Sequence, residues 1–294
     1  MLGRALLALL LMSTVAVCHS ETRVTILNDA FGRRADLTKD WGYSALVEYE
    51  GKRILFDTGG NIAIFRSNVE KMHVDLRHLD MVVVSHAHGD HTSGLRYVLD
   101  LNPGVALFVP DDVTFRGNPK APPFLKTHPE PALEKDHRYY DGAPYESLTG
   151  GWKAYSDTKL TVVKGAVTPL PGVRLISLVS DKPAFKGLVE ISMVLDTPKG
   201  PVVFAGCSHT GIENIAASTT EGAPSKNIYM LFGGLHLLED SEEQVNATLD
   251  VLEKDYHIQR MAVGHCTGEH VFLLIRKRWK KNDDFAGLGE TLVI

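Results

Sequence analysis

Residues 81–91 read Met-Val-Val-Val-Ser-His-Ala-His-Gly-Asp-His. The apolar run 81–84 predicts a buried strand, and four polar side chains follow it at His86, His88, Asp90 and His91. Imidazole and carboxylate are ligands that suit zinc, iron or manganese. They can serve two ions if the turn directs alternate side chains to opposite sides, and Gly89 leaves room for that turn. An exposed histidine-rich loop without a ligand is the alternative, and the preceding strand argues against it.

Three later segments place histidine or cysteine after a predicted strand. They are Gly206-Cys207-Ser208-His209-Thr210-Gly211, Gly233-Gly234-Leu235-His236 and Gly264-His265-Cys266-Thr267-Gly268. Glycine-rich strand ends that carry such side chains build sites at one edge of an α/β sheet. Asp57 also follows a strand, and we expect it to support a ligating imidazole through a hydrogen bond. Its alternative role is to cap the helix that follows.

Alternating apolar patterns predict a mixed fold. Strands are expected at 23–28, 44–50, 53–57, 81–84, 105–109, 173–179, 188–196, 201–206, 228–232 and 260–264, and helices at 61–72, 211–218, 242–255 and 268–279, with a short helix around 95–99. This order predicts an α/β (α+β) domain over residues 21–294, with two mixed β-sheets packed face to face and helices outside. Prolines interrupt residues 110–165, which we interpret as an irregular insertion that forms a lid, with surface padding as the alternative.

The motifs together resemble those of the metallo-β-lactamase superfamily. The resemblance rests on Phe56-Asp57-Thr58-Gly59, on the sequence SHAHGDH at 85–91 and on the late Gly264-His265, and it covers nearly all of residues 21–294. It implies an αββα four-layer sandwich with two metals at the sheet edge. The segments GCSHTGI, GGLHL and GHCTG are similar to a branch typified by 7,8-dihydropterin-6-methyl-4-(ribofuranosyl)aminobenzene 5′-phosphate synthase.

The resemblance also implies a ligand set. His86 and His88 match one metal site, while Asp90 and His91 match the other, which His265 closes. This sequence departs from many relatives, because residues 187–195 contain no histidine and Cys207 stands where a bridging aspartate is usual. We therefore expect His209 to complete the first site. Three roles remain open for Cys207: it bridges the metals, binds one of them, or only lines the site.

The first twenty residues have the pattern of a secretory signal peptide. Arg4 precedes the apolar run 5–17, and small residues follow up to Ser20. We expect cleavage near residue 20 and export to the periplasm or outside the cell, with no membrane span afterwards. A buried helix or uncleaved anchor is the less favoured interpretation, and Cys18 raises a lipoprotein alternative. The mature chain would keep 30 basic and 36 acidic residues, so we expect no nucleic-acid partner.

These observations predict a metal-dependent hydrolase that acts on a small molecule. Two divalent ions, expected to be zinc with manganese or iron as alternatives, can activate water and polarise a carbonyl or phosphoryl oxygen. The expected reaction is hydrolysis of an ester, phosphoester or amide-like bond, or a related phosphate displacement, with Asp90 and His236 in catalytic roles. The alternatives are an iron-dependent redox enzyme on the same scaffold and a non-catalytic binding protein.

Overall fold

The computed structural model describes residues 21–116 and 158–294, together with Pro131, Ala132, Glu134, Lys135, Arg138, Ala143, Pro144 and Tyr155. The expected signal peptide at 1–20 and most of the insertion expected at 110–165 lie outside the described residues. The two ends of that stretch are regular, because a helical turn spans Val113–Arg116 and a strand spans Lys159–Val163.

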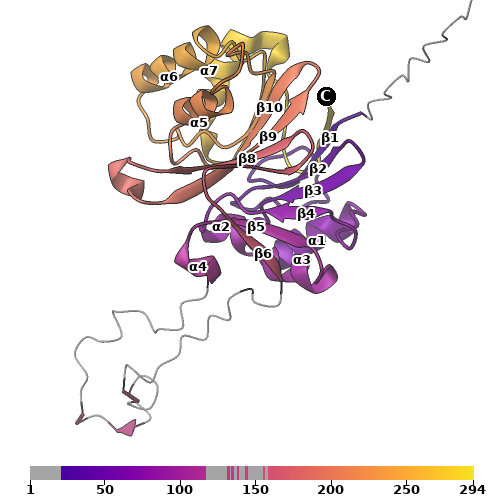
Figure 1. The fold of residues 1–294 in the computed structure, drawn as a ribbon, viewed down its shortest axis with the longest axis vertical. Helices are drawn as coiled ribbons and strands as arrows, with labels where there is room; N and C mark the ends of the chain where they lie inside the picture. The colour runs from indigo at the N-terminus through magenta and orange to yellow at the C-terminus, as the bar shows by residue number, and fades with distance from the viewer. Residues whose placement is uncertain are drawn as a thin grey trace, which may run out of the picture.

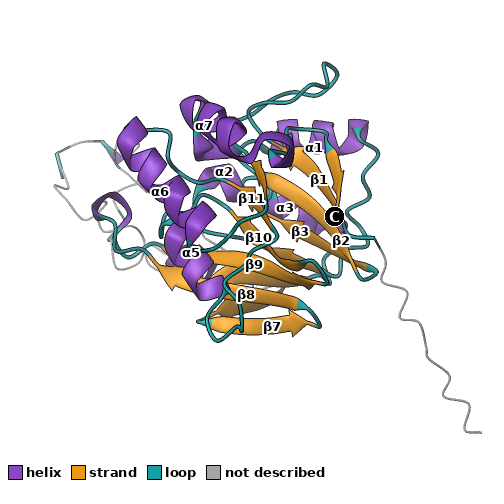
Figure 2. Ribbon diagram, turned by 90° about the horizontal axis from the view of Figure 1, so that it is seen from above, coloured by secondary structure: helices purple, strands orange, loops and turns teal. Residues whose placement is uncertain are grey.

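Two sheets form the centre of the molecule (Figures 1 and 2). The first has the strand order β13-β1-β2-β3-β4-β5-β6, with β1 (Arg23–Asn28), β2 (Ser44–Tyr49), β3 (Lys52–Phe56), β4 (Met81–Val83), β5 (Ala106–Pro110), β6 (Lys159–Val163) and β13 (Thr291–Val293). The second has the order β12-β11-β10-β9-β8-β7, with β7 (Ala166–Leu170), β8 (Val173–Val179), β9 (Val189–Thr197), β10 (Gly200–Ala205), β11 (Met230–Gly233) and β12 (Arg260–Val263). Both sheets mix parallel and antiparallel pairs, as predicted.

Helices cover the outer face of each sheet. The first sheet carries α1 (Ile62–Lys71), α3 (Leu95–Leu101) and α4 (Val113–Arg116), and the second carries α5 (Ile212–Thr219), α6 (Glu242–Lys254) and α7 (Glu269–Trp279). The short helix α2 (Gly89–Thr92) follows β4. Figure 1 shows the resulting order of layers, helices–sheet–sheet–helices. The predicted αββα sandwich is therefore confirmed.

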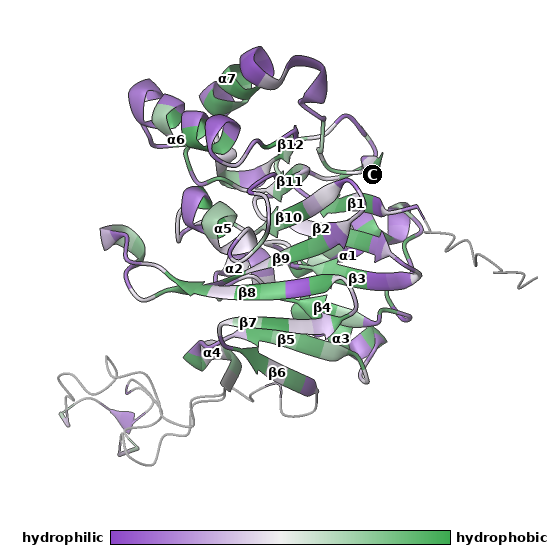
Figure 3. Ribbon diagram, turned by 45° about the horizontal axis from the view of Figure 1, so that its top comes forward, coloured by the Kyte–Doolittle hydropathy of each residue, from purple (hydrophilic) through white to green (hydrophobic). Residues whose placement is uncertain are grey.

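Three apolar clusters hold these layers together. One lies between the sheets, where Phe204 stacks on Phe232 with ring centroids 4.9 Å apart and also contacts Phe56 of the facing sheet. The other two lie between each sheet and its helices. Figure 3 shows the corresponding division, with apolar strands inside and polar helix surfaces outside. Burial of this apolar surface is the main stabilising contribution to such a core.

Three strands in the described part of the chain were not predicted from the sequence. β6 and β7 are the outermost strands of their sheets, and β13 pairs only with β1. β7 contains Pro169, which an edge strand tolerates because one side of its backbone needs no partner. Short edge strands have weak alternation, which explains why they were missed. Among the described residues, no helix has the length and apolar character needed to cross a bilayer.

The carboxyl ends of several parallel strands point to one edge of the sandwich. β3 and β4 are parallel neighbours in the first sheet, and β10, β11 and β12 are parallel neighbours in the second. The two sheets meet closely there: the Ile191 N–H donates to the Ser85 carbonyl at 2.7 Å, and a Cβ on Gly206 would lie 2.1 Å from Ser85 Oγ. Glycine at 206 is thus required for the loops that follow β4 and β10 to approach each other.

Candidate metal centre

Two groups of potential metal ligands lie at this edge. The first group consists of His86, His88 and His209, and the second group consists of Asp90, His91, Cys207 and His265. Within each group the ligand atoms lie within 4.8 Å of one another. The ring centroids of His86 and His91 are 4.2 Å apart, so the two groups are adjacent. Every residue expected from the sequence to bind metal belongs to one of them.

The first group brings residues of both sheets together. His86 and His88 follow β4, while His209 follows β10 on the facing sheet. His86 Nε2 lies 3.1 Å from His88 Nδ1, and the His209 ring centroid lies 4.8 Å from each of the other two. Neither ring nitrogen of buried His209 has a hydrogen-bond partner. A buried imidazole with two unpartnered nitrogens is costly unless a ligand satisfies it.

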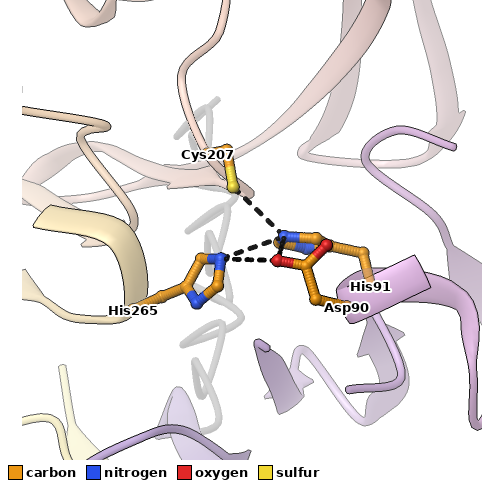
Figure 4. A group of neighbouring side chains, drawn as sticks. All are labelled: Asp90, His91, Cys207 and His265. Atoms are coloured by element: carbon orange, nitrogen blue, oxygen red, sulfur yellow. Dashed lines mark hydrogen bonds and ion pairs between the residues drawn. The ribbon is translucent and has the colours of Figure 1, made fainter. Parts of the chain in front are cut away.

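The second group is arranged around His91 (Figure 4). His91 Nε2 lies 3.2 Å from both Cys207 Sγ and His265 Nε2. Asp90 Oδ2 lies 3.4 Å from His265 Nε2. The four side chains in Figure 4 therefore direct nitrogen, oxygen and sulfur atoms towards one point, from three different segments of the chain.

Asp57 orients His91 of the second group through a hydrogen bond. Its Oδ2 accepts hydrogen bonds from His91 Nδ1 and Ser85 Oγ, and its Oδ1 accepts from the Ser85 N–H, all at 2.7 Å. The Nδ1 proton is thereby fixed, which leaves Nε2 as the free donor atom for a metal. This is the supporting contact expected from the sequence. The alternative of helix capping is wrong, because Asn61 caps α1 with its side chain.

Burial sets the protonation of the imidazoles. It lowers the pKa of His209 to about 3 and that of His265 to about 4, and it holds the pKa of His86 well below the usual range. These three side chains are therefore neutral near pH 7, which is the form that binds metals. Burial also lowers the pKa of His91, but the Asp57 carboxylate outweighs it and raises that pKa overall.

Cys207 and Asp90 supply the negative charge. Burial raises the pKa of the Cys207 thiol well above its usual range, so a nearby cation is needed to hold the thiolate. Burial alone would raise the pKa of Asp90, but its hydrogen bond with His265 and the charge of His91 lower it well below the usual range. The potential ligand atoms of the first group are three imidazole nitrogens. Those of the second group are two imidazole nitrogens, a carboxylate oxygen and a thiol sulfur. The residues present therefore fit two divalent ions.

Two buried carboxylates that the sequence analysis missed hold the ligand loops. Glu190 in β9 accepts hydrogen bonds from the backbone N–H groups of Cys207, Ser208 and Thr210 and from the Thr210 hydroxyl. A charged residue inside the apolar run 189–195 was the available signal. Asp29 accepts from the His265 N–H at 3.1 Å and 3.2 Å.

Asp29 supports an unusual backbone conformation. His265 has a φ of 48°, in the left-handed region that non-glycine residues rarely adopt. Burial raises the pKa of Asp29 to about 8, and the backbone N–H groups of Ala30 and His265 oppose this shift. Asp29 had no distinctive signal in the sequence, because an acidic residue after a strand is common in turns.

His236 lies beside the first group but outside both ligand sets. Its ring centroid is 4.4 Å from that of His209 and 4.9 Å from that of Phe185. It is half-buried, and burial lowers its pKa. The catalytic role expected of His236 stays a prediction. Phe185 and Trp41, which contact ligand rings, had no signal in the sequence.

Comparisons with known proteins agree with this geometry. The sequence profile of the metallo-beta-lactamase superfamily matches residues 38–175. An uncharacterised protein of Methanocaldococcus jannaschii is 30% identical over 236 residues, covering 77% of this chain and 84% of its own. The chain belongs to the metallo-β-lactamase superfamily.

Other relatives extend the match over most of the chain. The 7,8-dihydropterin-6-methyl-4-(beta-D-ribofuranosyl)-aminobenzene-5′-phosphate synthase of Methanocaldococcus jannaschii is 26% identical, with 85% of this chain and 89% of its own covered. The crystal structure of Tm1679, a metal-dependent hydrolase of the beta-lactamase superfamily, aligns with a TM-score of 0.65 and 23% identity over 93% of this chain and 99% of that one. The metallo-beta-lactamase fold protein YhfI from Bacillus subtilis aligns with a TM-score of 0.57 and 14% identity, over 94% of this chain and 100% of that one. The structural matches establish the shared fold.

Proposed function

We propose that this metallo-β-lactamase superfamily member is an exported two-metal hydrolase. It would act on an ester, phosphoester or amide-like bond of a small molecule, or catalyse a related phosphate displacement. The observation that carries the proposal is the pair of adjacent ligand groups, one of nitrogen donors and one of mixed donors, at a single sheet edge. Two divalent ions supply an activated water and a Lewis acid at such a site.

Each group has a distinct role in this proposal. The first group would hold one ion through three neutral imidazoles, and the second group would hold the other through two imidazoles, a carboxylate and a thiolate. Asp57 keeps the His91 Nε2 lone pair directed at the site. Asp90 contacts His265 Nε2 through Oδ2. Its other carboxylate oxygen could therefore accept a hydrogen bond from the attacking water.

His236 is suited to contact the substrate. Its lowered pKa makes it a neutral imidazole near pH 7, able to donate one proton and accept another. Zinc suits the mixed donor set, with manganese and iron as alternatives. The relative from Methanocaldococcus jannaschii is named as the synthase of a 5′-phosphate compound. We therefore propose phosphate displacement as a second reaction class, in addition to hydrolysis.

Metal analysis combined with a substrate panel tests this proposal. The purified mature protein should contain about two divalent ions per chain, by the usual count for such sites. It should hydrolyse at least one compound among phosphodiesters, phosphomonoesters, lactones, thioesters and β-lactams. His209→Ala should retain about one ion and lose activity, whereas His78→Ala, which changes an exposed histidine, should retain both.

Three outcomes would contradict the proposal. Full metal occupancy in folded His209→Ala would remove His209 from the ligand set. Two bound ions without hydrolysis of any substrate class would favour a binding protein. Iron with a visible absorption band, together with no hydrolysis, would favour redox chemistry.

A further inference from the structure

Two ligand histidines of the first sheet are oriented by hydrogen bonds. His91 Nδ1 donates to the buried Asp57 carboxylate at 2.7 Å. His86 Nδ1 lies 2.9 Å from the buried Ser85 hydroxyl, which itself donates to Asp57. A contact of this kind fixes the angle of an imidazole and leaves the opposite nitrogen free to bind an ion.

The histidines that the second sheet supplies have no such partner. Among the described residues, no hydrogen bond reaches either ring nitrogen of His209 or Nδ1 of His265, although both side chains are buried. An ion takes one nitrogen of each ring, so the other nitrogen gains no protein partner from metal binding. The torsion that turns an imidazole about its Cβ–Cγ bond has broad minima. Another contact must therefore fix the angle of these two rings.

An aromatic side chain packs against each of them. The Phe185 ring lies on His209 with centroids 4.1 Å apart and planes inclined by 47°. The Trp41 ring lies on His265 with centroids 4.9 Å apart and planes inclined by 51°. His236 also contacts His209, at 4.4 Å, so Phe185 is the nearer of these two rings. Aromatic pairs in contact contribute energy beyond their buried area and favour particular relative orientations.

The loop that carries Phe185 is tied to the residue whose ring it covers. The buried Ser180 hydroxyl donates to the His209 carbonyl at 2.8 Å. The Ser180 N–H donates to the Leu188 carbonyl and the Gly187 N–H donates to the Ser180 carbonyl, both at 2.8 Å. Within the loop, the Leu188 N–H donates to the Phe185 carbonyl at 2.9 Å. The position of Phe185 relative to His209 is therefore fixed by the backbone.

The turn that carries Trp41 is anchored as well. The Asn28 side-chain amide donates to the carbonyls of Asp40 and Gly42, on either side of Trp41, at 3.3 Å and 3.0 Å. A Cβ on Gly60 would lie 2.1 Å from the Trp41 carbonyl oxygen, so this turn packs directly on the segment after β3. The half-exposed indole thus extends from a fixed backbone onto the ring of His265.

We propose that Phe185 and Trp41 are positioning residues that hold the His209 and His265 rings at the angle an ion requires. Ring contact here takes the place of the hydrogen bonds that orient the histidines of the first sheet. Phe185 contacts the first group and Trp41 contacts the second, so each aromatic residue acts on one ion. The inference rests on the proposed two-metal site and adds an outer contact to each half of it.

Zinc affinity in variants that keep a single site tests this inference without substrate turnover. His265→Ala would report the ion of the first group, and His209→Ala the ion of the second, with competition against a chelator as the measurement. In the His265→Ala background, Phe185→Leu should weaken zinc binding about three- to tenfold, as expected for the loss of one aromatic pair. In the His209→Ala background it should change nothing. Trp41→Leu should give the reverse pattern.

Variants that keep a ring separate positioning from folding. In otherwise wild-type protein, Phe185→Tyr and Trp41→Phe should bind zinc as tightly as the wild type. Tyr97→Leu is the matched control, because Tyr97 is a half-buried ring on α3 that packs on Phe65 outside both ligand groups, and it should leave both zinc affinities unchanged. A role confined to folding would instead lower the unfolding free energy of the metal-free protein and weaken both ions equally.

Three results would overturn the inference. They are unchanged zinc affinity in both leucine variants, equal weakening of the two ions by one variant, and loss of affinity in the variants that keep a ring. Failure of the proposed function gives a different pattern: the wild type binds two ions and the leucine variants each weaken one, but no substrate in the panel is hydrolysed.

Discussion

Glu190 offers a sharp test of how the second sheet positions the ligands. Its Oε1 accepts from the Cys207 N–H at 3.2 Å and the Ser208 N–H at 2.8 Å, and its Oε2 accepts from the Thr210 N–H and hydroxyl, both at 3.2 Å. Burial raises the pKa of Glu190, while the backbone donors lower it. Four donors converge on this carboxylate, so it orders the turn that carries Cys207 and His209.

Glu190→Gln changes one half of this network. The glutamine oxygen can replace Oε1, and its NH₂ group then faces the Thr210 N–H, which leaves a buried donor opposite another donor. An unsatisfied buried N–H costs about 1–3 kcal/mol, so the free energy of unfolding should fall by that amount. Because the turn then holds its ligands less firmly, metal affinity should fall on the order of 10–100-fold.

Urea unfolding of metal-free protein and competition with a zinc chelator would measure the two effects. Glu221→Gln is the matched control, because Glu221 is exposed and lies outside the site, and it should change neither quantity. The argument would be refuted if Glu190→Gln matched the wild type in both unfolding free energy and zinc affinity.

Three other predictions concern the site and the N-terminus. Asparagine tolerates the left-handed φ of 59° at residue 57, so Asp57→Asn should keep the backbone and remove only the charge. Competition with a chelator should show metal binding weakened about 10–100-fold, because His91 is less well oriented; unchanged affinity would contradict the role given to Asp57. Cys207→Ser should lose one ion and most activity if the thiolate binds metal, since a hydroxyl is a poor substitute, and elemental analysis showing two ions would leave Cys207 as a lining residue. Protein from its native host should begin near residue 21, and N-terminal sequencing that finds Met1 in a cytosolic fraction would exclude export.

Local patterns in the sequence determined the buried strands of this protein and the residues at their ends. Apolar runs such as 81–84 and 189–195 are long and regular enough to predict buried strands. The turns after β4, β10, β11 and β12 place His86, Cys207, His236 and His265 at strand ends. Those strands lie within two residues of their predicted bounds. The weakly patterned edge strands β6, β7 and β13 escaped prediction because pairing with a neighbour, rather than their own sequence, makes them strands.

Only the tertiary structure decided which of these side chains meet. The distance between His91 and Cys207, 116 residues apart, depends on how the two sheets pack. The same packing places Asp29 under the backbone of His265, 236 residues away, and brings Ser180, which follows β8, against His209. Periodicity reports the neighbours of a residue along its own helix or strand. Contacts between distant segments instead follow from the shape of the whole core, which is why the roles of Asp29 and Trp41 emerged from the fold alone.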